Sequence, residues 1–159
     1  MDAASAPREP EALMHTVRRF DRTGLEILDP GECLRLLQSV PVGRLVFTQG
    51  GLPAVRLVNF SVDGDTIVFA SDDGEKFLAA ERGDVVAFEV DDIDLDHHLG
   101  WTVTSVGHLS VVPPEEAVWL QRANPLRPWA PLHEQRLIRL GTESLTGRRL
   151  LPWGERPQP

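Results

Sequence analysis

Residues 43–71, GRLVFTQGGLPAVRLVNFSVDGDTIVFAS, are the stretch that determines the fold class of this chain. They contain three β-prone runs, Gly43–Thr48, Leu52–Val62 and Thr66–Ser71, which are separated only by short turn sequences. The turn Asp63-Gly64-Asp65 is typical of a tight hairpin, because Asp-Gly tolerates the positive φ angles that such turns require. Strands joined by connections this short are expected to pair as antiparallel neighbours.

A helix is predicted on the N-terminal side of this stretch. Asp29 can cap its first turn, Pro30 suits the first helical position, and Glu32 can complete a capping box. Apolar residues then recur at helical spacing until Pro41 ends the helix.

The C-terminal half alternates strands with two short helices. Helices are predicted over residues 75–82 and 113–122, and strands over 85–90, 101–112, 134–140 and 145–150. The strand Val85–Val90 is apolar at nearly every position, which predicts burial on both faces or closure of a barrel. Asp91–Gly100 is expected to be an acidic loop. Many strands, short hairpins and few helices together predict a mainly β protein, a closed antiparallel barrel with peripheral helices.

One domain is expected between two loose ends, because 159 residues suffice for a single core. Residues 1–23 contain two prolines and many charges and are interpreted as a flexible N-terminal arm, which can include a short helix around Glu11–Phe20. Residues 24–150 are assigned to the barrel domain. Residues 151–159 contain three prolines and are interpreted as a C-terminal tail.

The composition argues against several classes of partner. A net charge of −8 disfavours nucleic-acid binding, which normally needs a basic face, and disfavours a cationic membrane anchor. No apolar run approaches the roughly 18 to 20 residues of a membrane span. The N-terminus lacks the basic start and apolar stretch of a signal peptide, so we expect a cytoplasmic protein. With a single cysteine, a zinc site built on cysteines is excluded.

Several segments, taken in order, resemble one known family. They are Glu32–Leu37, Val42–Leu45, Leu52–Phe60, Gly74–Phe77, Val85–Glu89, Gly100–Val103 and Val106–Leu109. Their order and spacing resemble the FMN-binding split-barrel superfamily, and within it the short actinobacterial-type proteins called pyridoxamine 5′-phosphate oxidase-like. The resemblance runs from about Leu28 to Leu150. It implies an antiparallel split barrel of six to seven strands that works as a homodimer, with FMN in a groove at the dimer interface.

The resemblance also implies which residues would bind the cofactor. The isoalloxazine would lie against the strand that carries Arg56 and Asn59, and the phosphate would lie near Ser71 and Lys76. The partner subunit would contribute residues equivalent to Trp101 and Trp129. Some members of the superfamily use the deazaflavin F420 instead of FMN, and others bind haem or have no cofactor.

The predicted phosphate site has a physical rationale and one departure from the family pattern. Lys76 falls in the first turn of its helix, so its ammonium and the free N–H groups of that turn can converge on one anion. Where relatives often have a basic residue before Ser71, this chain has Ala70, and Asp72 and Asp73 follow it. Carboxylates beside a phosphate repel it unless they point away. The alternative interpretation is that Asp73 caps the helix and Lys76 is a solvated surface residue.

Other candidate side chains have competing interpretations. Arg56 and Asn59 lie three residues apart on one strand and therefore face opposite sides. Each either contacts the flavin or belongs to an exposed strand end or an interface ion pair. Arg44 and Arg56 are candidates to supply the missing positive charge. The acidic run from Asp91 to His98 matches no metal-binding spacing, and we predict no metal site.

These observations favour a flavin-dependent oxidoreductase, with FMN preferred to F420, acting on a small planar or aromatic substrate. No nucleophile elbow, P-loop or dinucleotide-binding glycine motif occurs in the sequence, so no catalytic residue is assigned and a cofactor would carry the chemistry. The alternative is a non-catalytic split-barrel module with a degenerate flavin site, which would bind a small ligand, haem or a protein partner.

Overall fold

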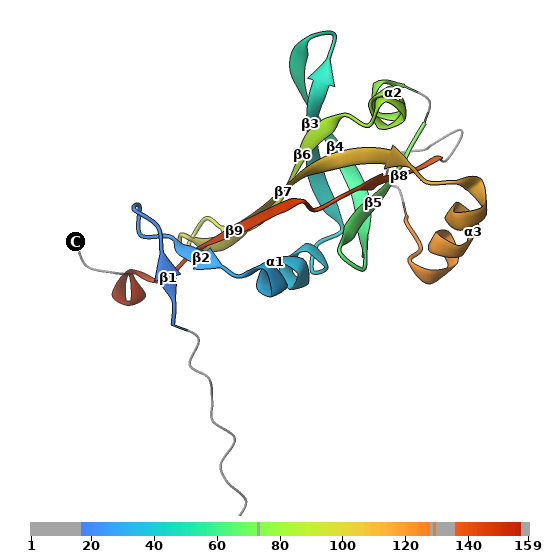
Figure 1. The fold of residues 1–159 in the computed structure, drawn as a ribbon. Coiled ribbons are helices and arrows are strands. Elements are labelled where there is room, and N and C mark those ends of the chain that lie inside the picture. The colour runs from blue at the N-terminus through green and yellow to red at the C-terminus, as the bar shows by residue number, and fades with distance from the viewer. Residues whose placement is uncertain (1–16, 73, 128, 130–135, 157–159) are drawn as a thin grey trace, which may run out of the picture.

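The meander predicted over residues 43–71 is present in the computed structural model of the protein (Figure 1). Strands β3 (Val42–Gln49), β4 (Leu52–Asp63) and β5 (Thr66–Ser71) pair antiparallel in sequence order. The structure describes residues 17–72, 74–127, 129 and 136–156.

Three further strands close this meander into a barrel. Strand β6 (Val85–Asp94) pairs with β3 and with β7 (Leu99–Val111), while β8 (Arg136–Leu140) pairs with β5 and with β7. The order β6-β3-β4-β5-β8-β7 therefore returns to β6, so these six strands have no free edge. The predicted mainly β antiparallel split barrel is confirmed.

An extension of the same sheet continues beyond the barrel along β7. Strand β9 (Ser144–Leu150) pairs with the first half of β7, β2 (Glu26–Leu28) pairs with β9, and β1 (Arg19–Phe20) pairs with β2. Figure 1 shows this extension at the left and the barrel at the right. The short helix expected around 11–20 lies mostly outside the described residues, and its last two positions form β1.

Gly107 is the residue at which β7 changes partner, from β9 before it to β8 after it. A side chain at this position would place its Cβ 2.0 Å from the carbonyl oxygen of Gly141. Glycine is therefore required here by the close approach of two backbones.

Three α-helices and one 3₁₀ turn lie around the sheet: α1 (Pro30–Leu37), α2 (Glu75–Arg82), α3 (Pro114–Ala123) and η1 (Trp153–Glu155). The Asp29 side chain caps α1 by accepting a hydrogen bond from the backbone N–H of Glu32 at 2.9 Å, as predicted. The second half of the expected capping box is absent among the described contacts, because the Glu32 carboxylate instead pairs with Arg35 and Arg149.

Alternate residues of each barrel strand fill one hydrophobic core. The largest buried side chains of this core include Leu45, Phe60, Phe69, Phe88 and Ile138. β6 closes the barrel between β3 and β7, which is one of the two roles predicted for this apolar strand, and it is buried on one face in the single chain. Val86, Phe88 and Val90 are buried, whereas Val85 on the opposite face is 58% exposed.

The expected acidic loop over Asp91–Gly100 is mostly strand. β6 continues to Asp94 and β7 begins at Leu99, so only residues 95–98 form the connection. The Asp94 carboxylate closes this turn by accepting hydrogen bonds from the backbone N–H groups of Asp96 and His97 at 3.0 Å each. Three of the four residues from Asp91 to Asp94 are carboxylates, and this explains why this end of the strand resembles a loop in the sequence. Across the described segments, no helix has the length and apolar character needed to traverse a membrane.

Candidate functional site

Arg56 lies on β4 with its side chain on the same face as the core residues Val58 and Phe60, beyond the end of the buried segment. Its Nη2 donates a hydrogen bond to Oε1 of Gln49 at 2.8 Å, and its Nη1 donates to the backbone oxygen of Val55 at 2.9 Å. The guanidinium is thus held in place at one end of the barrel while its side chain stays exposed to solvent.

Lys76 lies in the first turn of α2, as predicted, and is partly buried. It is the only lysine in the chain. Burial is the main effect on its ammonium and lowers the pKa of Lys76, the charge of Asp72 acts to raise it, and the charge of Arg56 acts to lower it. Arg56 and Asp72 are therefore each within electrostatic reach of Lys76, although 20 residues separate the two cations.

Ser71 ends β5 immediately before this group. It is buried, and its Oγ donates a hydrogen bond to the backbone oxygen of Asp72 at 2.9 Å. Oδ1 of Asp72 is also buried and has no hydrogen-bond partner among the described residues. Asp73, the second carboxylate of the sequence analysis, lies outside the described residues.

The N-terminus of α2 completes this group. No side chain in the described part of the chain caps the helix at Gly74, and the first helical hydrogen bond runs from the N–H of Leu78 to the oxygen of Gly74. The N–H groups that precede Leu78 in the helix therefore have no partner within it. We call Arg56, Ser71, Asp72 and Lys76, with this helix end, the basic cradle.

Asn59 and Trp129 form a second group, on the other face of β4. The backbone N–H of Trp129 donates to Oδ1 of Asn59 at 2.8 Å, and Nδ2 of Asn59 approaches the oxygen of Pro41 at 3.5 Å. The Trp129 side chain is 72% exposed. The structure therefore brings these two predicted residues together within one chain, across 70 positions of sequence.

A pocket of about 460 Å³ borders this second group. Its walls are the last residue of α1 with the segment after it, Leu37–Pro41, and Phe60–Val62 of β4, together with Asn124. This volume lies in the range of small-molecule sites. Pro41, which contacts Asn59, lines the pocket, so the pocket adjoins the strand segment that carries Arg56 and Asn59.

Trp101 is not brought together with the other predicted residues in this chain. It lies near the start of β7, opposite Asp92 of β6 and Arg149 of β9, and packs against the edge of the core. This position belongs to the sheet extension rather than to the end of the barrel that carries α2.

Arg44 does not supply charge to the basic cradle. It lies on the outer face of β3, where Nη1 contacts Oε2 of Glu89 at 3.0 Å and Oδ2 of Asp91 at 3.3 Å. The described residues contain no group of three side chains that could hold a metal ion.

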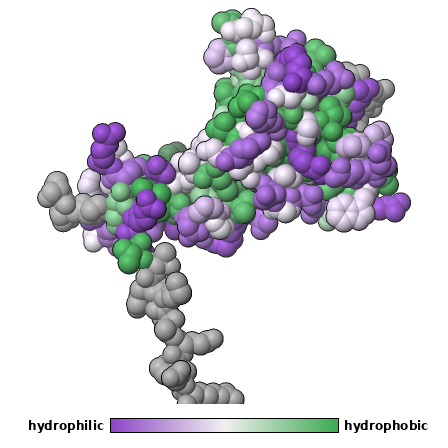
Figure 2. Space-filling view, viewed as in Figure 1, coloured by the Kyte–Doolittle hydropathy of each residue, from purple (hydrophilic) through white to green (hydrophobic). Residues whose placement is uncertain are grey.

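The outer face of the barrel carries a row of apolar residues. Val55, Val46, Ala87 and Val106 lie directly opposite one another across β4, β3, β6 and β7. Val55 is 54% exposed, and Leu57 beside the row is 66% exposed. We call Val46, Val55, Leu57, Val85, Ala87 and Val106 the outer patch. Figure 2 shows that hydrophobic surface is frequent over the barrel half of the molecule.

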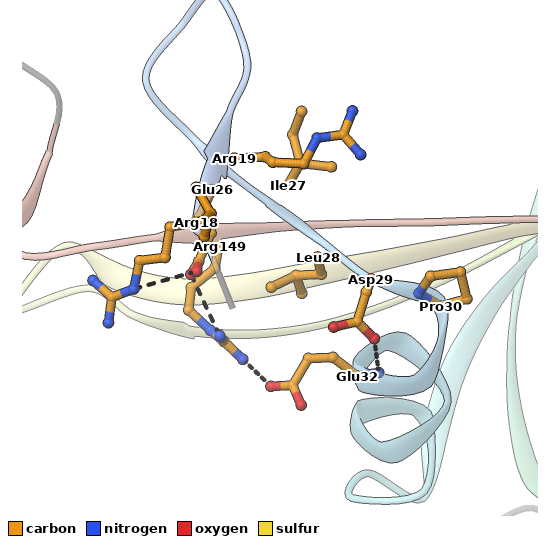
Figure 3. Close-up of a pocket in the computed structure, with 10 residues that line it drawn as sticks. Arg18, Arg19, Glu26, Ile27, Leu28, Asp29, Pro30, Glu32 and Arg149 are labelled. Atoms are coloured by element: carbon orange, nitrogen blue, oxygen red, sulfur yellow. Dashed lines mark hydrogen bonds and ion pairs between the residues drawn. The ribbon is translucent and has the colours of Figure 1, made fainter. Parts of the chain in front are cut away.

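A pocket of about 360 Å³ lies in the extension, between β2, α1 and β9 (Figure 3). Most charged side chains that line this pocket form ion pairs with one another. Arg149 pairs with Glu26 and Glu32, and Arg18 pairs with Glu26 at 3.5 Å. The ion pairs of this pocket join β2, α1 and β9, and we interpret them as contacts that stabilise the sheet extension.

Two contributors to these groups were not identified from the sequence. Gln49 positions Arg56, and the Pro41 carbonyl contacts Asn59. The hairpin register places Gln49 opposite Leu52, so Gln49 and Arg56 face the same side at the end of the meander. Alternation along the two strands was the signal that could have found Gln49. No comparable signal marks Pro41.

Comparisons with known proteins agree with this fold. The sequence model of the family described as pyridoxamine 5′-phosphate oxidase matches residues 29–149. An uncharacterized protein of Mycobacterium tuberculosis, Rv0080, is 38% identical over 130 residues, which cover 78% of this chain and 84% of that protein.

Two solved structures are also similar. The FAD binding protein from Mycobacterium smegmatis is 30% identical, with a TM-score of 0.64 over 78% of this chain and 96% of that one. A conserved protein of unknown function from Corynebacterium diphtheriae is 28% identical, with a TM-score of 0.65 over 80% of this chain and 99% of that one.

Proposed function

The chain belongs to the pyridoxamine 5′-phosphate oxidase family, and from this premise we propose that it is a flavin-dependent oxidoreductase whose Arg56, Ser71 and Lys76 hold the flavin phosphate. The substrate class is a small planar or aromatic molecule. The observation that carries the proposal is the basic cradle, where Arg56 of β4 is within electrostatic reach of Lys76 at an uncapped helix end.

The donor groups of the cradle fit a phosphate. A guanidinium, an ammonium, a hydroxyl and the N–H groups of a helix N-terminus are the donors that phosphate-binding sites use. The burial of Lys76 strengthens its interaction with an anion, because solvent screens the charges less there. Ser71 at present donates to the Asp72 backbone, and its hydroxyl can rotate toward a ligand.

Asn59 and Trp129 are the residues that we assign to the flavin ring. The Asn59 amide can hydrogen-bond polar atoms of the ring, and the exposed Trp129 side chain offers an aromatic face for stacking. A bound flavin would supply two-electron redox chemistry, while the chain's own residues bind and orient it. The pocket of about 460 Å³ beside Asn59 is the space that we assign to the ring or the substrate.

The similar M. smegmatis protein binds FAD, which supports a flavin as the class of cofactor. FMN, the cofactor implied by the resemblance, stays a prediction. FAD contains the same riboflavin phosphate, so Arg56, Ser71 and Lys76 would have the same role for either nucleotide.

A homodimer is the second part of the proposal. The outer patch carries an apolar row across four strands, and β6 has the composition of a strand buried on both faces although one face is exposed in the single chain. Burying this patch against a second copy would remove the exposed Val55, Leu57 and Val85 side chains from water. Trp101 and Trp129 would then be available to the groove between the two subunits.

Lys76→Met tests the assignment of the phosphate. It retains the apolar stem of the side chain and removes the charge, so the Kd for FMN should rise about tenfold to a hundredfold, while the Kd for riboflavin should not change. Arg122→Met removes an equal charge from the exposed face of α3 and serves as the control. Flavin fluorescence during titration reports both dissociation constants for each protein.

The sole lysine allows a second readout. FMN bound at the cradle should protect the Lys76 amine from an amine-specific reagent. The modification of side chains then reports on this site alone, because no other side chain in the protein carries a primary amine. If FMN binds equally to Lys76→Met and wild type, the phosphate assignment is wrong. If neither a flavin nor F420 binds, the non-catalytic module is favoured, and titration with haem would then test one of its expected ligands.

A further inference from the structure

Arg136 begins β8 as an exposed cation, and none of the residues assigned to the cofactor so far lies on this strand. The β5–β8 register places Arg136 directly opposite Ser71. Residues that are directly opposite on antiparallel strands have their side chains on the same face, with Cβ atoms about 4.5–5.5 Å apart. Arg136 therefore leaves the sheet beside the Ser71 side chain, which we assign to the flavin phosphate.

The face that these two residues share is the inner face of the barrel. The next pair on this face, Phe69 and Ile138, is fully buried in the core. β5 ends at Ser71, so the Arg136 side chain emerges where the apolar core stops and the end of the barrel begins.

Arg56 reaches the same end of the barrel from β4. Phe60 lies opposite Phe69 in the antiparallel β4–β5 pair, and Arg56 precedes Phe60 by four residues, so it lies on the same face and beyond the level of Ser71. Strands β4 and β8 flank β5 on its two sides. The strand register alone thus brings Arg56 and Arg136 to one barrel end, on either side of β5.

The guanidinium of Arg136 is also fixed against the first turn of α2. Its Cζ lies over the Phe77 ring at 4.5 Å from the ring centroid, and the Phe77 side chain is buried. Phe77 directly follows Lys76 in this turn. Stacking uses the flat face of a guanidinium, whereas its five N–H donors lie in its plane. An arginine held in this way can therefore bind an oxyanion while it keeps other contacts.

We propose that Arg136 is a further phosphate-binding residue of this site, which contacts the flavin phosphate together with Ser71 and Lys76. This inference rests on the proposed flavin function and adds to it a residue that discriminates between flavins with and without a phosphate. A planar guanidinium binds a phosphate through two parallel N–H···O hydrogen bonds, which the ammonium of Lys76 cannot form. The stack on Phe77 orients the guanidinium before the ligand arrives.

Arg136→Met tests this assignment, because it retains an apolar side chain over Phe77 and removes the guanidinium. Wild type and variant are titrated with FMN and with riboflavin at pH 7.5 and constant ionic strength. We expect the Kd for FMN to rise about tenfold and the Kd for riboflavin to stay unchanged. Arg136→Lys retains the charge without the planar group and should give a smaller rise for FMN.

Arg139→Met is the matched control on the same strand. Arg139 lies three residues further along β8 on the opposite face, where its Nη2 pairs with Oε1 of Glu116 at 2.5 Å. Its removal changes the charge of β8 equally and should leave the ratio of the Kd values for FMN and riboflavin as in wild type. Far-ultraviolet circular dichroism verifies that each variant retains the barrel.

The outcomes separate this inference from the proposed function. If Lys76→Met weakens FMN binding and Arg136→Met does not, Arg136 is not a phosphate ligand, while the flavin function stands. An equal rise in the Kd for FMN and for riboflavin in Arg136→Met would also overturn the inference, because it would indicate that Arg136 only packs the barrel end. If wild type binds neither FMN nor riboflavin, both the inference and the flavin function are overturned.

Discussion

Ser105 is a buried polar residue that the proposed site does not use. It lies on β7 between Phe88 of β6 and Leu145 of β9, is fully buried, and its Oγ has no hydrogen-bond partner among the described residues. Ser71 is the matched case, because it is also buried but its Oγ donates a hydrogen bond. Substitution of Ser105 measures the free-energy cost of burying an unpaired hydroxyl, whereas substitution of Ser71 measures the loss of a buried hydrogen bond.

Ser105→Ala should leave the free energy of unfolding unchanged or raise it by up to about 1 kcal/mol, because an unpaired hydroxyl leaves the core. Ser71→Ala should lower it by about 1 kcal/mol, since a hydrogen bond is lost. Urea denaturation of both variants gives the comparison. A loss of stability in Ser105→Ala as large as that in Ser71→Ala would contradict this account.

At the scale of single residues, the sequence could identify candidate site residues but not the distances between them. Lys76 was predicted at the start of its helix from local signals alone, and the structure has it there. Its proximity to Arg56 depends on how far β4 extends beyond the core and on where α2 packs, and neither is a local property. The contact between Asn59 and Trp129 spans 70 residues and has no local signal.

Helix α1 is fixed to the sheet extension by charge. The hydrogen bond from Arg35 is the main cause that lowers the pKa of Glu32 to about 2, and Arg149 of β9 contributes next. The pKa of Asp21 is also lowered to about 2, chiefly by the Thr23 hydroxyl, with Arg148 of β9 among the weaker causes. Both carboxylates therefore favour the folded state in their ionised form.

Acid should weaken the protein over a defined pH range. A carboxylate with a lowered pKa contributes stability that is complete above its unfolded pKa of about 4 and is lost as pH falls toward 2. The free energy of unfolding should therefore decrease between pH 5 and pH 2, as urea titrations at each pH would show. Glu32→Gln should make this decrease shallower, whereas Glu81→Gln, on exposed α2 surface, should not. Equal slopes in the two variants would argue against the role of Glu32.

Long elements were predicted better than short ones. The cap at Asp29, the Asp-Gly turn and apolar alternation located the start of α1 and both ends of β4 and β5 to within a residue or so, because these signals are local. The end of α1 was predicted less well, because the helix stops at Leu37 and does not continue to Pro41. Strands β1 and β2 have two and three residues, which is too short for a periodic pattern. β2 forms because β9, more than 100 residues away, offers it an edge, and β1 pairs in turn with β2.

For the whole molecule, the outer patch is the feature that a single chain leaves unexplained. Leu57 is 66% exposed within it, while Leu95 is 77% exposed at the β6–β7 turn, away from the patch. An isolated exposed leucine is ordinary, whereas an apolar row across four strands indicates an interface.

Leu57→Glu should convert the proposed dimer to a monomer, because it places a charge within the outer patch, beside its apolar row. Leu95→Glu introduces the same charge outside the patch and should remain dimeric. Sedimentation velocity at micromolar concentration distinguishes the two states, and far-ultraviolet circular dichroism verifies that the barrel is retained. Wild-type protein that sediments as a monomer would rule out the dimer.

Flavin binding is the central claim for the molecule, and the visible absorption spectrum tests it most directly. The purified full chain is incubated with FMN or FAD, separated from free cofactor by gel filtration, and its spectrum recorded. We predict flavin absorption bands that co-elute with the protein and are diminished in Lys76→Met. A colourless wild-type protein after incubation with either flavin would contradict the claim.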